Sequence, residues 1–177
     1  MESNLKTLGS IVLLFVLFFS SFKLLADFSV RIIGYCQYDV FTLDIETSFN
    51  GSSTFELCTN DQDRFVRTTT STIKYSSNDQ RSEISKIAEI TNLSVSEFEK
   101  LVSLYKNALK FNISDNTTGL DGSNWCLTSR NGMNSVKACF WTPSAEPEER
   151  GLLGLHELGK HLWQISKLNE RNDVSFY

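Results

Sequence analysis

The residues with the clearest chemistry are four cysteines, at Cys36, Cys58, Cys126 and Cys139. In an exported chain an even number of cysteines predicts disulfide bonds, and four cysteines allow three pairings. The sequence favours Cys36–Cys58 and Cys126–Cys139, because each of these pairs is local. The second pair also flanks Asn131-Gly132, a strong hairpin signal. Its two cysteines have the same parity about that turn, so they project from one face of the hairpin.

Zinc is the competing interpretation, since His156 and His161 are spaced like the histidine half of a zinc finger. The cysteine half does not fit, because twelve residues separate Cys126 from Cys139 and zinc fingers place only two to four there. The two histidines also miss the spacing of the zinc-protease helix, i and i+4. At i+5 their imidazoles diverge by about 140° on a regular helix. We therefore predict no metal site and no cofactor.

Motifs for other chemistry are absent from the sequence. It contains neither the G-x-S-x-G turn of many hydrolases nor a glycine-rich phosphate loop. Two carboxylate pairs remain as candidates for acid–base chemistry, Asp44 with Glu46 and Asp61 with Asp63. We expect the first pair to line the wet face of a strand and the second to end a strand. The protein is therefore expected to have no catalytic residues, with an exported hydrolase that uses a carboxylate site as the alternative.

Aromatic residues around the cysteine hairpin are the leading candidates for binding. Parity about the turn places Trp125 and Phe140 on one face and Trp141 on the face of the cysteines. One face must cover the core, and the other would present an aromatic ring to a protein partner or a glycan. In the alternative, both indoles lie in the core beneath the last helix and its Trp163. The predicted binding residues are Asp121, Asn124, Trp125 and Trp141.

Strands are predicted between the N-terminal segment and residue 75. Residues 40–46 alternate between apolar and polar side chains, which predicts a strand with one buried face. A turn at Asn50-Gly51 leads into residues 54–58, so a hairpin is expected. The threonine-rich segment 65–75 predicts a third strand. Residues 29–36 are a candidate edge strand before these.

Helices are predicted in three places. Ile84, Ile87 and Ala88 recur at helical spacing, which indicates a short helix over residues 80–90. Ser94 and Glu97 then form a capping box that begins a helix with an apolar stripe from residue 98 to residue 109. The last helix is expected to begin after Ser144, as its N-cap, and to run to about Leu168, with a frayed tail from residue 169.

These elements predict an α+β fold, because strands are grouped first and helices are interleaved later. The expected architecture is a small antiparallel sheet, including two hairpins, with about three helices packed on one face and two disulfides. A length of 177 residues fits one domain.

The N-terminus predicts export. Residues 7–22 carry no charge, follow Lys6 and precede a candidate cleavage point after Ala26. That pattern is typical of a secretory signal peptide over residues 1–26, which leaves residues 27–177 as a single domain. The expected location is the periplasm or the extracellular space. An uncleaved helix that anchors the protein in the membrane is the alternative.

Composition and charge narrow the partners. The net charge of −4 argues against nucleic acid, because phosphate binding needs clustered lysine and arginine. The sequence thus predicts an exported, non-catalytic domain that binds a protein partner, as an inhibitor does. A membrane contact is expected only through residues 1–26, as in a membrane-anchored accessory protein.

Overall fold

The computed structural model describes residues 36–61, 63–75, 82–131, 134–172, 174 and 176. The predicted signal segment 1–26 and residues 29–35 of the candidate edge strand lie outside these residues. The described elements are β1 (Tyr38–Thr47), β2 (Gly51–Asn60), β3 (Asp63–Tyr75), β4 (Ser82–Asn92), α2 (Val95–Ala108), β5 (Ser123–Asn131), β6 (Asn134–Trp141), α3 (Leu153–Ile165) and the short 3-10 helix η1 (Leu168–Glu170).

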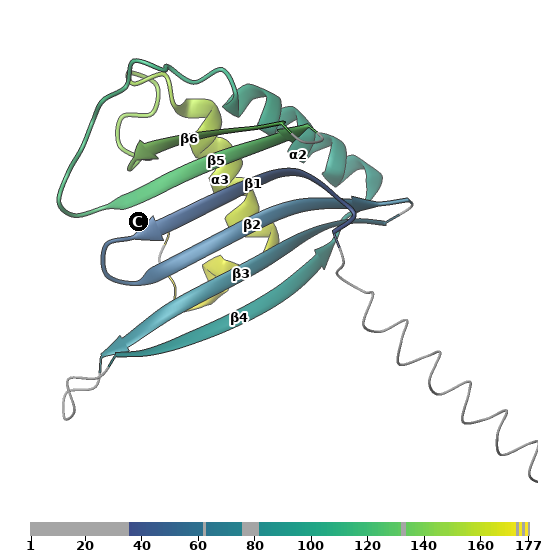
Figure 1. Ribbon diagram of the computed structural model, residues 1–177, viewed down its shortest axis with the longest axis horizontal. Coiled ribbons are helices and arrows are strands. Elements are labelled where there is room, and N and C mark those ends of the chain that lie inside the picture. The colour runs from purple at the N-terminus through teal and green to yellow at the C-terminus, as the bar shows by residue number, and fades with distance from the viewer. Residues whose placement is uncertain are drawn as a thin grey trace, which may run out of the picture. The chain divides into compact units, whose positions relative to one another are not determined.

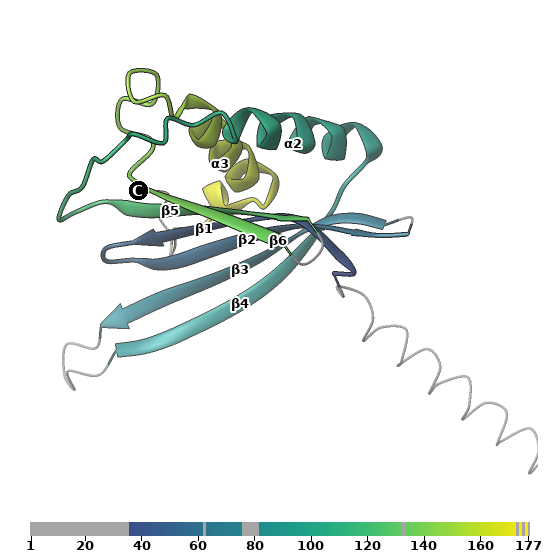
Figure 2. The same ribbon diagram turned by 45° about the horizontal axis from the view of Figure 1, so that its top comes forward.

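The six strands form one antiparallel sheet in the order β4-β3-β2-β1-β5-β6. The helices α2 and α3 lie on one face of this sheet (Figures 1 and 2). We call this the helix face and the other the open face. Because side chains alternate along a strand, the central strands β2, β1 and β5 send every second residue into the core beneath the helices.

The core is built from the apolar residues of the central strands and the two helices. Phe41 stacks on Tyr105 of α2, with 4.8 Å between the ring centroids. Phe55 meets Trp163 of α3 edge-on. The fully buried large side chains are Trp125, Phe41, Phe55, Leu43, Ile45, Leu57, Leu101, Leu127, Leu152, Leu155, Leu158 and Leu162. Burial of this apolar surface is the main force that holds the helices on the sheet.

Glycine is required at two positions where another part of the protein approaches the backbone closely. Gly51 has φ 98°, and a side chain there would collide with the backbone oxygen of Ser71. Gly159 lies in α3 directly over Trp125, whose ring a Cβ would overlap. The glycine in α3 therefore lowers helix propensity but lets the helix pack tightly against the sheet.

The helix α2 follows the sequence prediction closely. Ser94 is its N-cap, and both hydrogen bonds of the capping box with Glu97 are present. The Glu97 carboxylate accepts from the Ser94 hydroxyl and backbone N–H, which lowers the pKa of Glu97. Arg64, at the start of β3, lies over the Phe98 ring and ties this end of α2 to the sheet.

The predicted fold class is wrong in the size of its sheet and the number of its helices. Residues 82–92 form a strand, β4, which pairs with β3 from Phe65↔Asn92 to Tyr75↔Ser82. The spacing of Ile84, Ile87 and Ala88 fits one helical face, but such a short pattern does not exclude a strand. A ladder with β3 satisfies the backbone groups of β4 that face β3 over the full length of the strand, and this pairing overrides the local pattern. The described residues contain two α-helices rather than three.

The start of the last helix was also predicted wrongly. α3 begins at Leu153, its N-cap Leu152 makes no side-chain capping bond, and Ser144 lies in a turn. The helix ends at Ile165 rather than at Leu168. The sequence predicts a frayed tail from residue 169, whereas Phe176 packs against Trp125 and Trp163, at 4.9 and 5.1 Å between ring centroids.

The disulfides are the predicted ones, Cys36–Cys58 and Cys126–Cys139. Cys58 and Cys126 follow buried core residues, so their side chains point to the open face. Among the described residues no cysteine is free. Two disulfides suggest an oxidising, exported environment.

None of the helices in the described part of the chain is long and apolar enough to cross a membrane.

Candidate functional site

The four residues predicted to bind a partner do not form one surface. Trp125 is fully buried in the core, and Asn124 and Trp141 occupy opposite positions on the open face. The predicted parity of the hairpin is therefore right. Asp121 is exposed in the turn before β5. Since Trp125 and Trp141 point to opposite faces, one ligand cannot contact both indoles.

Trp141 is partly covered by the loop before β5. Gly119 and Gly122 approach its indole so closely that a Cβ on either residue would crowd the ring. Arg150 fixes the backbone at this residue, because it donates hydrogen bonds to the carbonyl oxygens of Trp141 and Thr142 at 2.7 and 2.8 Å. This half-buried ring is better explained as part of the hairpin's support than as an open binding platform.

Arg150 also forms a well-shielded ion pair. Its guanidinium makes two hydrogen bonds to Asp115, at 3.0 and 2.8 Å, and only 10% and 6% of the two side chains are exposed. The hydrogen bond from Arg150 holds the pKa of Asp115 below its ordinary value. The pair therefore fixes the loop of residues 112–122 against the end of β6.

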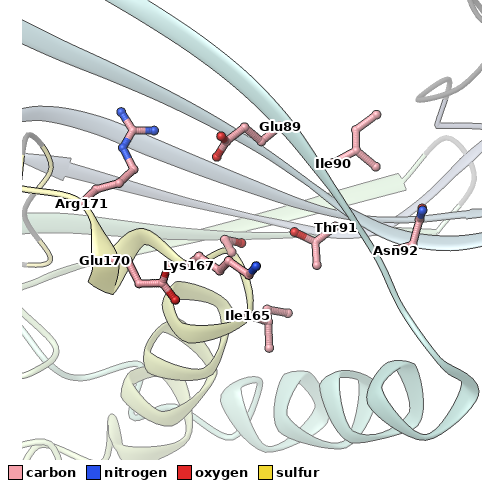
Figure 3. A pocket seen from close by; sticks show the side chains of 9 residues that line it. Glu89, Ile90, Thr91, Asn92, Ile165, Lys167, Glu170 and Arg171 are labelled. Carbon is pink, nitrogen blue, oxygen red and sulfur yellow. The ribbon is translucent and has the colours of Figure 1, made fainter.

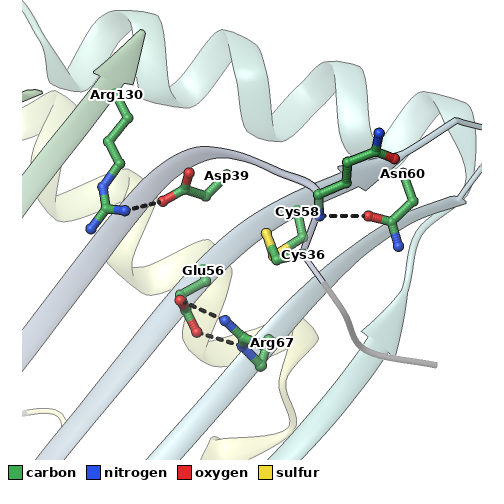
Figure 4. The surroundings of a disulfide bond; sticks show 8 residues. Cys36, Asp39, Glu56, Cys58, Asn60, Arg67 and Arg130 are labelled. Carbon is green, nitrogen blue, oxygen red and sulfur yellow. Dashed lines mark hydrogen bonds and ion pairs between the residues drawn. A yellow bond between two sulfur atoms is a disulfide. The ribbon is translucent and has the colours of Figure 1, made fainter. Parts of the chain in front are cut away.

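Two pairs of oppositely charged side chains lie on the open face. Arg67 binds both carboxylate oxygens of Glu56, at 2.6 and 2.8 Å, and Arg130 contacts Asp39 at 3.1 Å (Figure 4). The hydrogen bond to Glu56 raises the pKa of Arg67. These ion pairs flank the Cys36–Cys58 disulfide. They brace neighbouring strands, as cross-strand pairs of opposite charge do.

The carboxylates considered for acid–base chemistry lie apart from the grooves described below. Asp44 accepts a hydrogen bond of 2.8 Å from Thr54 on the next strand. Glu46 is exposed near the end of β1, and Asp61 and Asp63 lie at the turn between β2 and β3. None of the four lines either groove.

The two histidines are placed within α3 and serve its packing. His156 stacks on Trp125, with 6.3 Å between ring centroids, and also lies near Phe176. His161 is close to the charged residues Glu97 and Lys100 of α2. Burial lowers the pKa of both imidazoles, so the neutral forms are favoured at neutral pH.

The most unusual surface is the outer edge of β4, residues Ser82–Asn92, which we call the β4 edge. β4 is the last strand of the sheet, and no other described strand pairs with its outer side. Three isoleucines stand on it with large exposed fractions, Ile84 at 66%, Ile90 at 41% and Ile87 at 40%. Register with β3 places Ile84 and Ile90 on the open face and Ile87 on the helix face.

A groove of about 760 Å³ runs beside this edge on the helix face. Its lining comes from β4 on one side and from the end of α3 with η1 on the other (Figure 3). Glu89 and Thr91 point toward the α3 end, whereas Ile90 points to the opposite side of the strand. We call it the β4 groove; it is lined by Glu89, Ile90, Thr91, Asn92, Ile165, Ser166, Lys167, Glu170 and Arg171.

The groove exists because the helix layer stops over β3. Ser166, at the end of α3, is buried and hydrogen-bonds to the Thr68 hydroxyl at 2.8 Å. Arg171 donates to the Thr70 hydroxyl at 3.3 Å. Lys167 adopts a left-handed φ of 54°, which ends the helix between these two anchors. Since α3 is anchored on β3, β4 lies beyond the helix layer.

A second groove, of about 420 Å³, lies between the two helices. Its lining is largely apolar and includes Leu104, Phe111 and Leu153. Gly154 allows the backbones to approach here, because a Cβ on it would press on the Asn107 carbonyl group. This groove is a gap in the helix packing, and Lys110 and Glu157 are its charged lining residues.

Sequence reasoning missed the β4 edge because it placed Ile84 and Ile87 on the buried face of a helix. The length of the threonine-rich third strand was the available signal. A strand of 13 residues with buried threonines on one side needs a partner along most of its length. The segment 82–92, rich in isoleucine and threonine, is the next piece of chain that can supply one.

No protein-family model matches this chain, and no curated protein matches it.

Proposed function

We propose that this protein is an exported, non-catalytic binding domain of the periplasm or the extracellular space, and that it accepts an extended polypeptide strand along the β4 edge. The observation that carries the proposal is the exposure of Ile84, Ile87 and Ile90 on a long outermost strand. Such an edge presents a row of backbone N–H and C=O groups that can pair with another chain.

The β4 groove supports the same function. In recognition by strand addition, main-chain hydrogen bonds give affinity, and pockets for alternate side chains give specificity. The groove adjoins residues 89–92 of the edge, so alternate side chains of an added strand would enter it. Lys167 and Glu170 supply charges of both signs beside the apolar side chain of Ile165.

The proposal is tested by selecting peptides from a random display library on the purified, oxidised protein. We expect the selected peptides to bind the unmodified protein and to lose at least tenfold in affinity for the variant Ile90→Lys. A lysine at this position replaces an apolar contact of the added strand by a charge that must stay hydrated.

The matched control is Val136→Lys, which makes the same kind of change on the other outermost strand, β6. Peptides that use the β4 edge should bind this variant as they bind the unmodified protein. Equal binding of the selected peptides to Ile90→Lys and to the unmodified protein would refute the proposed function.

A further inference from the structure

The isoleucines of β4 are arranged symmetrically about the centre of the strand. β4 runs from Ser82 to Asn92, Ile87 is its central residue, and Ile84 and Ile90 stand three residues to either side. A two-fold axis perpendicular to the sheet at Ile87 would bring a second copy of β4 alongside the first in antiparallel orientation. The chain would then pair over the full length of the strand.

This register places apolar residues opposite one another. Ile84 of each copy lies opposite Ile90 of the other, on the open face, and the two Ile87 residues meet at the axis on the helix face. Lys86 lies opposite Ala88, and Ser85 lies opposite Glu89. No two like charges occupy opposing positions over the eleven residues. Cross-strand apolar pairs of this kind are a main source of sheet stability.

Other antiparallel registers are worse. Opposing residues must share a face, so the register shifts only in steps that keep the side-chain parity. The next register on one side places Lys86 opposite Lys86 and Ile87 opposite Ser85. The next register on the other side places Ile87 opposite Glu89 and Ile90 opposite Lys86. Only the register centred on Ile87 pairs all eleven residues of the strand and also places isoleucine opposite isoleucine.

The helix layer leaves room for this pairing. α3 is anchored on β3 through Ser166 and Thr68, so one strand of each copy extends beyond its helices. With strands spaced by roughly 4.8 Å, two overhanging strands would separate the two helix layers. The β4 groove of each copy would then face residues 82–85 of the other.

We propose that the strand accepted by the β4 edge is β4 of a second copy of this chain, paired antiparallel about a two-fold axis at Ile87. This inference rests on the proposed function, because it names the partner of the same edge. The product is a dimer with one continuous twelve-stranded sheet, both helix layers on the same side.

The first test measures the molar mass of the purified, oxidised protein by analytical ultracentrifugation over a range of concentrations. We expect a reversible monomer–dimer equilibrium. The variant Ile87→Lys should weaken dimerisation at least tenfold, because it places two like charges against each other at the axis. The control Val136→Lys should dimerise like the unmodified protein. A protein that stays monomeric at every concentration would overturn the inference.

The second test reports the register. In the variant Ile87→Cys, the new thiols of two copies face each other at the axis, and mild oxidation should give a covalent dimer. In Lys86→Cys the new thiol lies opposite Ala88, with its counterpart about 8 Å away along the diagonal, which is too far for a disulfide. Mass mapping must show that Cys36–Cys58 and Cys126–Cys139 are intact. Equal cross-linking of both variants would contradict the register.

The outcomes separate this inference from the proposed function. If the protein is monomeric but Ile90→Lys still abolishes peptide binding, the edge binds another polypeptide and the second copy is excluded. If dimerisation is insensitive to Ile87→Lys, the contact lies elsewhere and the inference fails. If peptide binding is also unchanged in Ile90→Lys, the proposed function fails with it.

Discussion

The two outer strands of the sheet, β4 and β6, solve the problem of an unpaired edge in different ways. β6 has eight residues, is joined to β5 by Cys126–Cys139, and carries the core residue Phe140. Arg150 binds the carbonyl oxygen of its last residue, Trp141. β4 has eleven residues and extends beyond the helix layer with three exposed isoleucines. Shorter edge strands with a lysine on them, such as β6 with Lys137, resist association, whereas long apolar edges invite it.

The two edges therefore have different roles. The β6 edge contributes to stability, and the β4 edge is the proposed binding surface. The β6 edge is tied to the core and to the loop of residues 112–122, so substitutions there are expected to act on folding. The β4 edge is held mainly by its ladder with β3, so substitutions of its exposed side chains are expected to act on association. Substitutions at the two edges test this division of roles.

The largest effect is expected for Phe140→Ala on β6. Phe140 is buried and packs against Phe111, so the substitution should lower the free energy of unfolding by about 3–5 kcal/mol. The corresponding change on β4, Ile90→Ala, should lower it by less than about 1 kcal/mol, because much of that side chain is already in water. Urea denaturation of both variants measures the two losses in the free energy of unfolding. Similar losses would show that β4 is not an overhanging edge.

Removal of the β6 disulfide comes next. The double variant Cys126→Ser, Cys139→Ser opens a loop with a sequence separation of 13 residues and should lower the free energy of unfolding by about 3 kcal/mol. Thermal unfolding of the variant and the oxidised parent measures this loss. Because Ile87 lies on the other edge, dimer formation by the folded variant should be unchanged, and a lost dimer would argue against the division.

The ion pair of Asp115 with Arg150 gives a pH-dependent contrast. Asp115→Asn should lower the free energy of unfolding by about 2 kcal/mol at neutral pH, since it removes hydrogen bonds between charged groups. Because the pKa of Asp115 is lowered from 3.8 in the folded state, its contribution is present above that value. It is lost as the pH falls through the lowered pKa.

Urea denaturation at a series of pH values checks this prediction. The difference in stability between the parent and Asp115→Asn should shrink on acidification below about pH 4. The conservative change Asp44→Asn, on the open face, serves as a control. A difference that stays constant with pH would mean that the carboxylate charge of Asp115 does not stabilise the fold.

The smallest effect on folding is expected for Ile84→Ser. Ile84 is the most exposed of the three isoleucines, and the substitution should change the free energy of unfolding by no more than about 0.5 kcal/mol. Its expected effect on the dimer is larger, because Ile84 meets Ile90 of the second copy twice per dimer. Paired measurements of unfolding and sedimentation test this, and a large loss of stability with an unchanged dimer would reverse the roles given to the two edges.

Local patterns in the sequence were sufficient to predict the elements that interactions between nearby residues specify. The capping box at Ser94 and Glu97 begins α2, and the Asn131-Gly132 turn fixes the parity of the β5–β6 hairpin. Both disulfides follow from that hairpin and from the locality of the cysteines. These features depend on residues that lie close together in the chain, so their spacing carries the information.

Tertiary structure decided the features that depend on pairing and packing between separate elements. Whether residues 82–92 are helix or strand depends on the unpaired edge of β3, and whether Trp125 is available for binding depends on α3 packing over it. The β4 edge and its groove arise because Ser166 bonds to Thr68, 98 positions away in the sequence. Hydrophobic packing and backbone pairing between separate elements outweigh local propensity by several kcal/mol, and a spacing pattern within one element does not encode them.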